Sequence, residues 1–403
     1  MTVETMTSGI LLQISGIGKC RVQFLVHLVR LYLSIRGRIN FLSMERYGQY
    51  GEQTYRQHFE RPMDFKTFNE LLIRKHCSKD LAWVFDPSYI NKSGKHTPGV
   101  GYFWSGCAGR MKWGLELSAL GIIDVENHTA MHYEATRTTY DKGAKDEESL
   151  RKFYAKLILN QSERMQKLSK TMIVDAFFSK LSFVEPLSKA GFVLISRLQS
   201  NACLRYRYLG EQKGGKGRKK TFAERVDLKK LNPLHFTEIS RSEEEVAYEG
   251  VVHVRALKRW CKVVVVQTLK EDGSVKKALC YFSTDVTMEG KKVWELYGSR
   301  FQIEFLFRDA KGHLGLEHCQ SRQEEALDFH FNHALTTLNL AKATHWLSVD
   351  KEQRGPFSMA DIKTQYSNQL LLDRIISIYG KDPSVEKNNP KIKELYQLGR
   401  IAA

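Results

Sequence analysis

The feature that most constrains the fold is a pair of short apolar runs, each of which leads directly into an aspartate. The sequence LAWVF at 81–85 precedes Asp86, and TMIV at 171–174 precedes Asp175. Runs of this length and composition predict strands buried on both faces. An aspartate after a strand is often only a turn former or a helix cap, so neither position alone indicates a function. The nearest alternatives to Asp86 are Asp80, Asp285 and Asp124, of which Asp124 also ends a strand-like run.

Strands and helices alternate around these two aspartates. The other expected elements are strands at 100–106, 111–124 and 192–198, a helix that opens with Asp146, and a short helix that stops at Gly191. The acidic opening of the longer helix suits the positive end of a helix dipole. The order is therefore strand, two strands, helix, strand, helix, strand, which predicts an α/β fold.

The stretch WELYGSRFQIEFLFRDAKGH at 294–313 is expected to form one helix. At about 100° per residue, Tyr297, Arg300, Glu304 and Lys311 fall within an arc of roughly 60°. This face combines one carboxylate, which can hold a metal ion, with two cations and a phenol, which can grip phosphates. It suits an enzyme that cuts a nucleic-acid backbone. The alternative is an ordinary surface helix with an i,i+4 ion pair between Arg300 and Glu304.

The charge balance indicates a polyanionic partner. The 403 residues include 62 Lys and Arg against 45 Asp and Glu, a net charge of +17. Nucleic acid is the first candidate partner and an anionic membrane the second. The apolar run at 22–35 is too short to span a bilayer and contains Arg30, so no membrane association is expected. Seven scattered cysteines without a CxxC pair favour a reducing cytoplasm over a zinc site or a disulfide framework.

Two basic segments are candidates for DNA contact. Residues 1–80 look helical and carry twelve Lys or Arg against seven Asp or Glu. Residues 201–232 carry ten against three, and include GEQKGGKGRKK, which cannot form a regular element. Here Arg218, Lys219 and Lys220 are candidate phosphate contacts, and the glycines let the backbone approach phosphates. The alternatives are an exposed helical packing unit for the first segment and a solvated basic loop for the second.

Strand-like runs continue through the region 199–290, with Asp272-Gly273 as a hairpin turn. A long buried helix is expected at 326–340, with His330 and His333 as core or surface residues rather than metal ligands. Residues 346–403 are helical in pattern and nearly balanced in charge.

The spacing Tyr297, two residues, Arg300, three residues, Glu304, six residues, Lys311 resembles the signature of DDE transposases of the insertion-sequence-four-like family. The resemblance is clearest from about residue 40 to residue 345. It implies a ribonuclease-H-like catalytic core, which has the order of strands and helices given above. In that core two catalytic acids sit at neighbouring strand ends and a third on a later helix, with a β-rich insertion before that helix.

The resemblance assigns the catalytic, metal-binding acids to Asp86, Asp175 and Glu304. It implies two Mg²⁺ ions, for which Mn²⁺ can substitute, with Asp86 bridging both. Tyr297, Arg300 and Lys311 are then expected to hold the DNA strand. The implied reaction is cut-and-paste transposition through a hairpinned end, by a homodimer that binds the terminal inverted repeats of an insertion sequence and a target DNA.

The expected organisation has three parts. They are a helical DNA-binding region at 1–80, a catalytic domain at 81–345 with its insertion at about 199–290, and a helical region at 346–403. We expect a protein of the bacterial cytoplasm, associated with the nucleoid. Two other functions stay open: a catalytically inactive, domesticated DNA-binding protein, and a ribonuclease-H-like nuclease of another kind, such as a Holliday-junction resolvase. The presence of all three acids argues against the first, and the Tyr-Arg-Glu-Lys spacing against the second.

Overall fold

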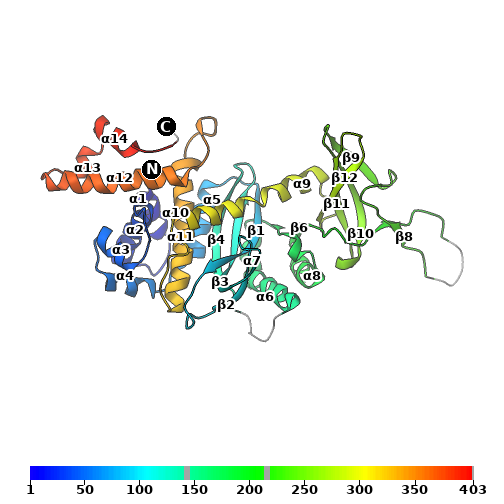
Figure 1. The fold of residues 1–403 in the computed structure, drawn as a ribbon, viewed down its shortest axis with the longest axis horizontal. Helices are drawn as coiled ribbons and strands as arrows, with labels where there is room; N and C mark the ends of the chain where they lie inside the picture. Colours follow the sequence, from blue (N-terminus) through cyan, green and yellow to red (C-terminus); the bar gives the residue numbers. More distant parts are fainter. Residues whose placement is uncertain (140–145, 213–217, 402–403) are drawn as a thin grey trace.

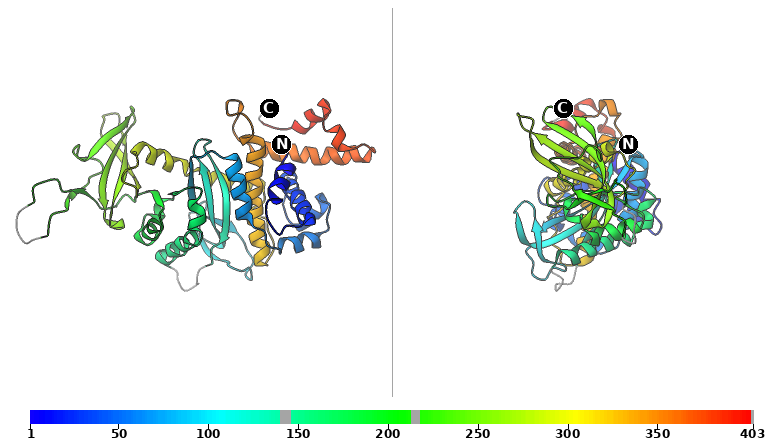
Figure 2. Two further views of the ribbon diagram at one scale, coloured as in Figure 1. Left: turned by 180° about the vertical axis from the view of Figure 1, so that it is seen from behind. Right: turned by 90° about the vertical axis from the view of Figure 1, so that its right-hand side faces the viewer.

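The computed structural model describes residues 1–139, 146–212 and 218–401. The molecule is elongated, with helices from both termini at one end, a mixed α/β core in the middle and further strands at the other end (Figure 1, Figure 2). The expected mixed α/β class is therefore present. No helix within the described ranges is long and apolar enough to cross a membrane.

Five strands form the centre of the sheet in the spatial order β4, β3, β1, β5, β6. They are β1 (Leu81–Asn91), β3 (Arg110–Asp124), β4 (Thr129–Arg137), β5 (Thr171–Ile173) and β6 (Val193–Arg197). β1 runs antiparallel to β3 and parallel to β5, and β5 runs parallel to β6. The strand expected at 100–106 is present as β2 (Gly101–Ser105), which forms a hairpin with the start of β3. The sequence analysis missed β4, which pairs with β3 in the core.

Side chains of α11 (Glu324–Lys342) complete the outer edge of β4. Asn339 accepts a hydrogen bond from the N–H of His132 at 2.8 Å, and Asn332 accepts one from that of Ala135 at 2.9 Å. The two side-chain amides donate back to the carbonyls of the same residues. A sheet edge satisfied in this way is protected from pairing with another strand. This cover explains how TAMHYEATR, whose polar residues obscure a strand pattern, becomes a core strand.

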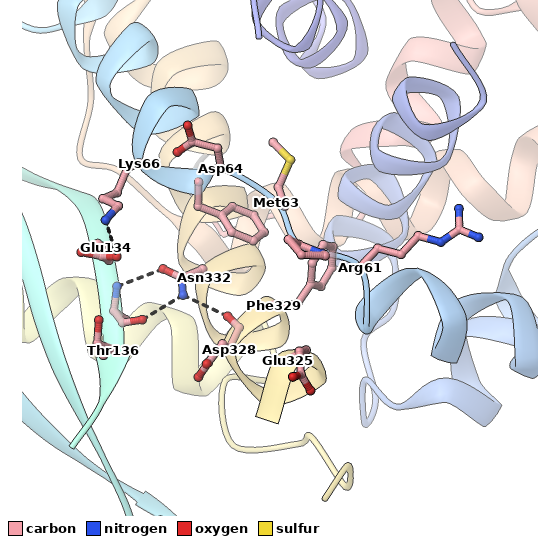
Figure 3. A pocket seen from close by; sticks show the side chains of 13 residues that line it. Arg61, Met63, Asp64, Lys66, Glu134, Thr136, Glu325, Asp328, Phe329 and Asn332 are labelled. Carbon is pink, nitrogen blue, oxygen red and sulfur yellow. Dashed lines mark hydrogen bonds and ion pairs between the residues drawn. The ribbon is translucent and has the colours of Figure 1, made fainter. Parts of the chain in front are cut away.

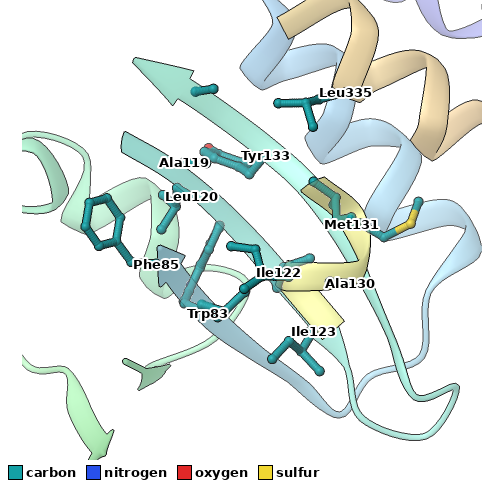
Figure 4. Packing of buried hydrophobic residues seen from close by; sticks show 14 of the residues in the cluster. Trp83, Phe85, Ala119, Leu120, Ile122, Ile123, Ala130, Met131, Tyr133 and Leu335 are labelled. Atoms are coloured by element: carbon teal, nitrogen blue, oxygen red, sulfur yellow. The ribbon is translucent and has the colours of Figure 1, made fainter. Parts of the chain in front are cut away.

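Helices lie against both faces of this unit. α6 (Glu147–Leu159), α7 (Ser162–Gln166) and α8 (Leu181–Lys189) form one layer, whereas α5 (Phe65–His76), α10 (Gln302–His313) and α11 lie on the β4 side (Figure 1). The Trp83 indole donates to the Met165 carbonyl of α7 at 3.1 Å, and Phe85 packs on Tyr154 of α6. Figure 4 shows the buried side chains of β1, β3 and β4 around Trp83 and Phe85.

The region 199–290 extends the core sheet. Its strands are β7 (Leu204–Arg207), β8 (Phe222–Arg225), β9 (Phe236–Arg241), β10 (Glu245–Val254), β11 (Arg259–Leu269) and β12 (Val275–Ser283). β12 pairs antiparallel with β6, so twelve strands of the described residues form one continuous sheet. The turn between β11 and β12 has Gly273 at φ 75°, as expected for the Asp272-Gly273 hairpin.

Helices from the two ends of the chain pack together. They are α1 (Val3–Leu11), α2 (Lys19–Ser34), α3 (Phe41–Tyr47), α4 (Glu52–Phe59), α12 (Met359–Ile378), α13 (Pro383–Glu386) and α14 (Pro390–Gln397). Tyr32 of α2 hydrogen-bonds His330 of α11 at 2.8 Å, and Lys363 of α12 donates to the Tyr32 carbonyl at 2.7 Å. His330 and His333 are buried, and burial lowers the pKa of both imidazoles. Both histidines therefore belong to the core that joins these helices.

Candidate active site

Asp86 and Asp175 come from neighbouring parallel strands. β1 and β5 pair Trp83 with Met172 and Val84 with Ile173. Continued by two residues, this register brings Asp86 level with Asp175, and adjacent strands lie about 4.8 Å apart. Because each aspartate follows the apolar run of its own strand, the pairing of β1 with β5 places the Asp86 and Asp175 residues side by side.

Asp86 lies within β1 and not at its end, which corrects the sequence analysis. β1 continues to Asn91 because it stays paired with β3, whereas its other neighbour β5 stops at Ile173. β1 therefore extends beyond the end of β5, and Asp86 lies where the pairing between these two parallel strands has ended, at their carboxyl ends. Crevices at such ends are the usual ligand sites of α/β sheets.

Two hydrogen bonds fix Asp175, one to its side chain and one to its backbone carbonyl. Its side chain accepts the N–H of Phe177 at 2.9 Å and so caps the short helix η1 (Ala176–Phe178). Its carbonyl accepts the hydroxyl of Ser196, on β6, at 2.7 Å. Burial raises the pKa of Asp175, although the bond from Phe177 and the charge of Arg300 act in the opposite direction.

The stretch 294–313 is not one helix, as the sequence analysis expected, but two. α9 (Gly290–Ser299) ends just before Arg300, and α10 begins at Gln302. Arg300 and Phe301 keep right-handed helical angles, but the N–H groups of Arg300, Ile303 and Glu304 bond to carbonyls three residues back. This tighter turn replaces the four-residue pattern. Such a change leaves no mark in residue spacing, because no proline or cap residue interrupts the run.

Arg300 connects the tyrosine and the acids of this turn. Its guanidinium donates to the Glu304 carboxylate at 2.7 Å. Burial raises the pKa of Asp86, Asp175 and Tyr297, and the positive charge of Arg300 lies close enough to all three to oppose that rise. The Arg300 side chain is 12% exposed and that of Glu304 is 45% exposed. A buried cation therefore sits among the three candidate acids.

Burial is the main cause that raises the pKa of Asp86 to about 7. The nearby carboxyl groups of Asp175, Glu304 and Glu116 act in the same direction, and Arg300 opposes them. Like charges that share one site raise one another's pKa. The other two candidate acids, Asp175 and Glu304, therefore both lie within electrostatic reach of Asp86.

Lys311 points back into the protein from the far end of α10. Its ammonium donates to the Tyr89 carbonyl of β1 at 2.7 Å and lies 3.7 Å from Glu317. Tyr89 is three residues beyond Asp86 on the same strand, so Lys311 fastens α10 to the strand that carries the first acid. In this structure its hydrogen bond goes to the backbone.

A comparison with protein-family models now bears on this arrangement. Residues 122–340, more than half of the chain, match the transposase DDE domain. The chain belongs to this family. No curated protein matches the sequence. Membership makes the chain a transposase, an enzyme class that acts on DNA and generally uses divalent metal ions, and it implies a ribonuclease-H-like fold. The matched segment contains Asp175 and Glu304, whereas Asp86 precedes it.

The rival aspartates of this transposase domain have other partners. Asp124 is fully buried and accepts both the N–H and the hydroxyl of Ser78. Asp285 accepts two hydrogen bonds from Thr287, and these bonds lower its pKa. Asp80 forms an ion pair with a lysine of α9. Each of the three stabilises a local turn or helix contact.

Glu116 is an acid beside the site that the sequence analysis missed. It lies on β3, is buried, accepts a hydrogen bond from the Tyr154 hydroxyl, and has a pKa raised by burial. Glu116 pairs with Tyr89, three positions from the Asp86 pair, so its side chain starts from the opposite face of the sheet. The sequence feature that could have identified Glu116 is the presence of a single acid within an otherwise apolar strand.

The carboxylate set fits a divalent metal by its donor chemistry, since Mg²⁺ prefers carboxylate oxygens. Among the residues that the structure describes, no three His, Cys, Asp or Glu side chains are already arranged to hold a metal ion. Glu304 is instead hydrogen-bonded to the guanidinium of Arg300.

A separate hollow of about 420 Å³ lies between α5, α11 and β4 (Figure 3). Its lining includes Asp64, Glu134, Asp328 and Asn332 but none of the three candidate acids. Asp328 forms an ion pair with Arg137, and Asn332 bonds the β4 backbone. These polar groups serve the fold, so the hollow is not the catalytic site.

The predicted basic loop is described in part. Arg218, Lys219 and Lys220 are all exposed, and the ammonium of Lys220 lies 4.5 Å from the ring centre of Tyr208. Residues 213–217, which include Gly214, Gly215 and Gly217 of the loop, lie outside the described ranges. The three cations remain available to a polyanion.

Proposed function

We propose that the chain is a cut-and-paste transposase of the insertion-sequence-four-like group, with Asp86, Asp175 and Glu304 as its catalytic acids. The observation that carries the proposal is the placement of Asp86 beside Asp175, with Glu304 brought to them by Arg300. Ile303 of α10 and Val84 of β1 both lie against Gly121, on the sheet face that also carries Asp86. The helix of Glu304 therefore covers the face from which Asp86 projects.

The chemistry follows from these groups. Mg²⁺ or Mn²⁺ bound by the three carboxylates would activate a water or a 3′-hydroxyl and stabilise the leaving oxygen. Asp86 must lose its proton to bind a cation, which its pKa of about 7 permits near neutral pH. Arg300, once free of Glu304, can hold a phosphate through two parallel N–H groups. Tyr297 is buried and its ring packs on Tyr281, so its proposed contact with DNA is a hydrogen bond from its hydroxyl to a phosphate.

The DNA partners are the terminal inverted repeats and the target. We assign DNA contact to the basic region 1–80 and to Arg218, Lys219 and Lys220, and catalysis to residues 81–345, with the helical region 346–403 appended. Exposed cations of the first region include Arg36, Arg38 and Arg46. Two copies would act together, because cutting and joining both ends of one element requires two such sites.

The test is cleavage of the element's own end. Short inverted repeats in the DNA that flanks the gene define an oligonucleotide duplex, which is incubated with purified protein and Mg²⁺ or Mn²⁺. The proposal expects a nick at the end followed by a hairpin. Binding of that duplex without cleavage would identify an inactive DNA-binding protein instead. Cleavage of four-way junctions in preference to ends would identify a resolvase.

A further inference from the structure

The hairpin of β2 with the start of β3, residues 101–113, carries large apolar side chains on its surface. We call it the aromatic ribbon. Its register pairs Tyr102 with Trp113 and Trp104 with Met111, so these four side chains share one face. Tyr102 is 64% exposed, Trp104 59% and Met111 52%. Large apolar groups clustered in this way on a surface mark an interaction site.

The stretch of chain that contains the aromatic ribbon carries only basic charge. From residue 87 to residue 115 the sequence contains four Lys or Arg and no Asp or Glu, a net charge of +4. Arg110 and Lys112 lie on the face opposite the aromatic side chains, where Lys112 sits 5.6 Å from the ring centre of Tyr89. Aromatic groups interleaved with cations suit a nucleic acid, whose bases stack and whose phosphates need positive charge.

The aromatic ribbon shares a strand with the catalytic acids. β3 pairs without a register shift with both β2 and β1, and Ala119 is opposite Asp86. Trp113 and Met111 are six and eight residues from Ala119, so they start from the same face as Asp86, roughly 20–26 Å away at about 3.3 Å per residue. At about 3.4 Å per nucleotide step, this distance corresponds to roughly six to eight nucleotides.

The aromatic ribbon is also coupled mechanically to α10. The Tyr89 hydroxyl donates to the Trp113 carbonyl at 2.6 Å, and the Tyr89 carbonyl accepts the hydrogen bond from Lys311. The base of the ribbon and the helix that carries Glu304 are thus fixed to the same residue. The position of the ribbon relative to the acids is therefore set by the fold.

We propose that the aromatic ribbon is a DNA-binding surface that stacks on unpaired bases six to eight nucleotides from the cleaved phosphodiester. This inference rests on the proposed function, because the acids define where cleavage occurs. Tyr102 and Trp104 supply the stacking surfaces, and Arg110 and Lys112, on the opposite face of the ribbon, supply positive charge that attracts the phosphate backbone. Stacking tolerates any sequence, so the surface recognises distorted or opened DNA rather than a specific base.

The test compares two probes of arbitrary sequence, a blunt 28-base-pair duplex and a 20-base-pair duplex with an eight-nucleotide thymidine tail. Affinity is measured by fluorescence anisotropy in EDTA, where no cleavage interferes. Tyr102→Ala with Trp104→Ala should weaken binding of the tailed probe at least about fivefold, the lower limit for losing one stacked base. The blunt duplex should lose less, and Trp104→Phe should retain most of the affinity for the tail.

Tyr379→Ala, which removes an aromatic group that is 78% exposed at the end of α12, is the matched control and should leave both affinities unchanged. Equal affinities of wild type and the double variant for the tailed probe would overturn the proposal. So would a lower mass of the double variant in light scattering, which would assign the ribbon to a contact between two copies. If the wild type cleaves element ends while the ribbon variants bind normally, the ribbon proposal fails and the proposed function stands. If the wild type does not cleave, the proposed function fails.

Discussion

Arg300 donates a hydrogen bond of 2.7 Å to Glu304 across the turn that joins α9 to α10. The same guanidinium opposes the rise that burial causes in the pKa of Asp86 and Asp175, so one cation acts on three carboxyl groups. Without a metal, those groups would repel one another and resist ionisation. The positive charge of Arg300 therefore offsets part of the repulsion among these acids.

Glu304→Gln should separate DNA binding from cleavage. The amide keeps the size of the side chain but removes the charge that a metal ion requires. We expect cleavage of the element's end to disappear, while binding of that end stays near the wild-type level or tightens because repulsion from phosphates falls. Comparable cleavage rates in the variant and the wild type, measured on one labelled oligonucleotide, would show that Glu304 is not the third acid. Glu295→Gln, on α9, is the matched control and should cleave normally.

Arg300→Ala should damage binding and catalysis together. It removes the phosphate contact proposed for the DNA complex and the cation that opposes the rise in the pKa of Asp86. The pH at which cleavage reaches half its maximum should therefore move upward, in addition to weaker binding of the end. Arg308→Ala, which removes an exposed cation from α10, should leave this pH unchanged. A pH profile identical to wild type would contradict the electrostatic role of Arg300.

Lys311→Met should act mainly on stability. The ammonium bonds the Tyr89 carbonyl, and loss of that bond leaves a backbone acceptor without its partner. We expect the free energy of unfolding to fall by about 1–3 kcal/mol, as measured by urea denaturation. If stability is unchanged and only DNA affinity falls, Lys311 contacts phosphate as the signature implies and its backbone bond is incidental.

The candidate residues of the site could be predicted from the sequence more fully than their positions within the strands and helices. Asp86 and Asp175 could be found because buried strands are apolar runs, and the parallel pairing of β1 with β5 then fixed their neighbourhood. The position of Asp86 inside β1 was not predictable, since strand length depends on how far β3 continues alongside. The division of 294–313 into two helices depends on hydrogen bonds that shift by one carbonyl, which residue spacing does not record.

The same limit applies to the fold. β4 escaped prediction because its stability comes from Asn332 and Asn339, about 200 residues further along the chain. Glu116 escaped because a single acid in a strand reads as a surface position, whereas α6 covers it and Tyr154 bonds it. Contacts between distant segments decide both cases, and local pattern carries no information about them.

Replacing Arg218, Lys219 and Lys220 with Ala should weaken DNA binding in a salt-dependent way. Each lost phosphate contact should flatten the slope of log K against log salt by about 0.9. All three side chains are exposed, so folding should not change. Replacement of the exposed Lys276 and Lys277 on β12 by Ala serves as the control for a general loss of positive charge. An unchanged slope in the triple variant would mean that the loop is only solvated.

Asp86→Asn should stabilise the metal-free protein above neutral pH. The pKa of Asp86 is raised from its ordinary value near 3.8 to about 7, so the folded state binds the proton more tightly than the unfolded state. The wild type therefore loses stability as pH rises from about 4 to about 7, and the loss is complete above that range. The amide removes this loss, which amounts to roughly 4 kcal/mol at most. Urea denaturation in EDTA should thus show the variant as more stable at pH 8 and nearly equal to wild type at pH 4.

Magnesium completes this test. At pH 8 Mg²⁺ should raise the free energy of unfolding of the wild type, because it binds the folded carboxylates, and should have little effect on Asp86→Asn. Asp285→Asn should change stability in the opposite direction. Hydrogen bonds from Thr287 lower the pKa of Asp285, so its ionised form stabilises the fold. That variant should lose stability at pH 8 and keep its response to Mg²⁺. If Asp86→Asn is less stable than wild type at pH 8 and still responds to Mg²⁺, then the pKa of Asp86 is not raised in the folded protein and Asp86 is not a metal ligand.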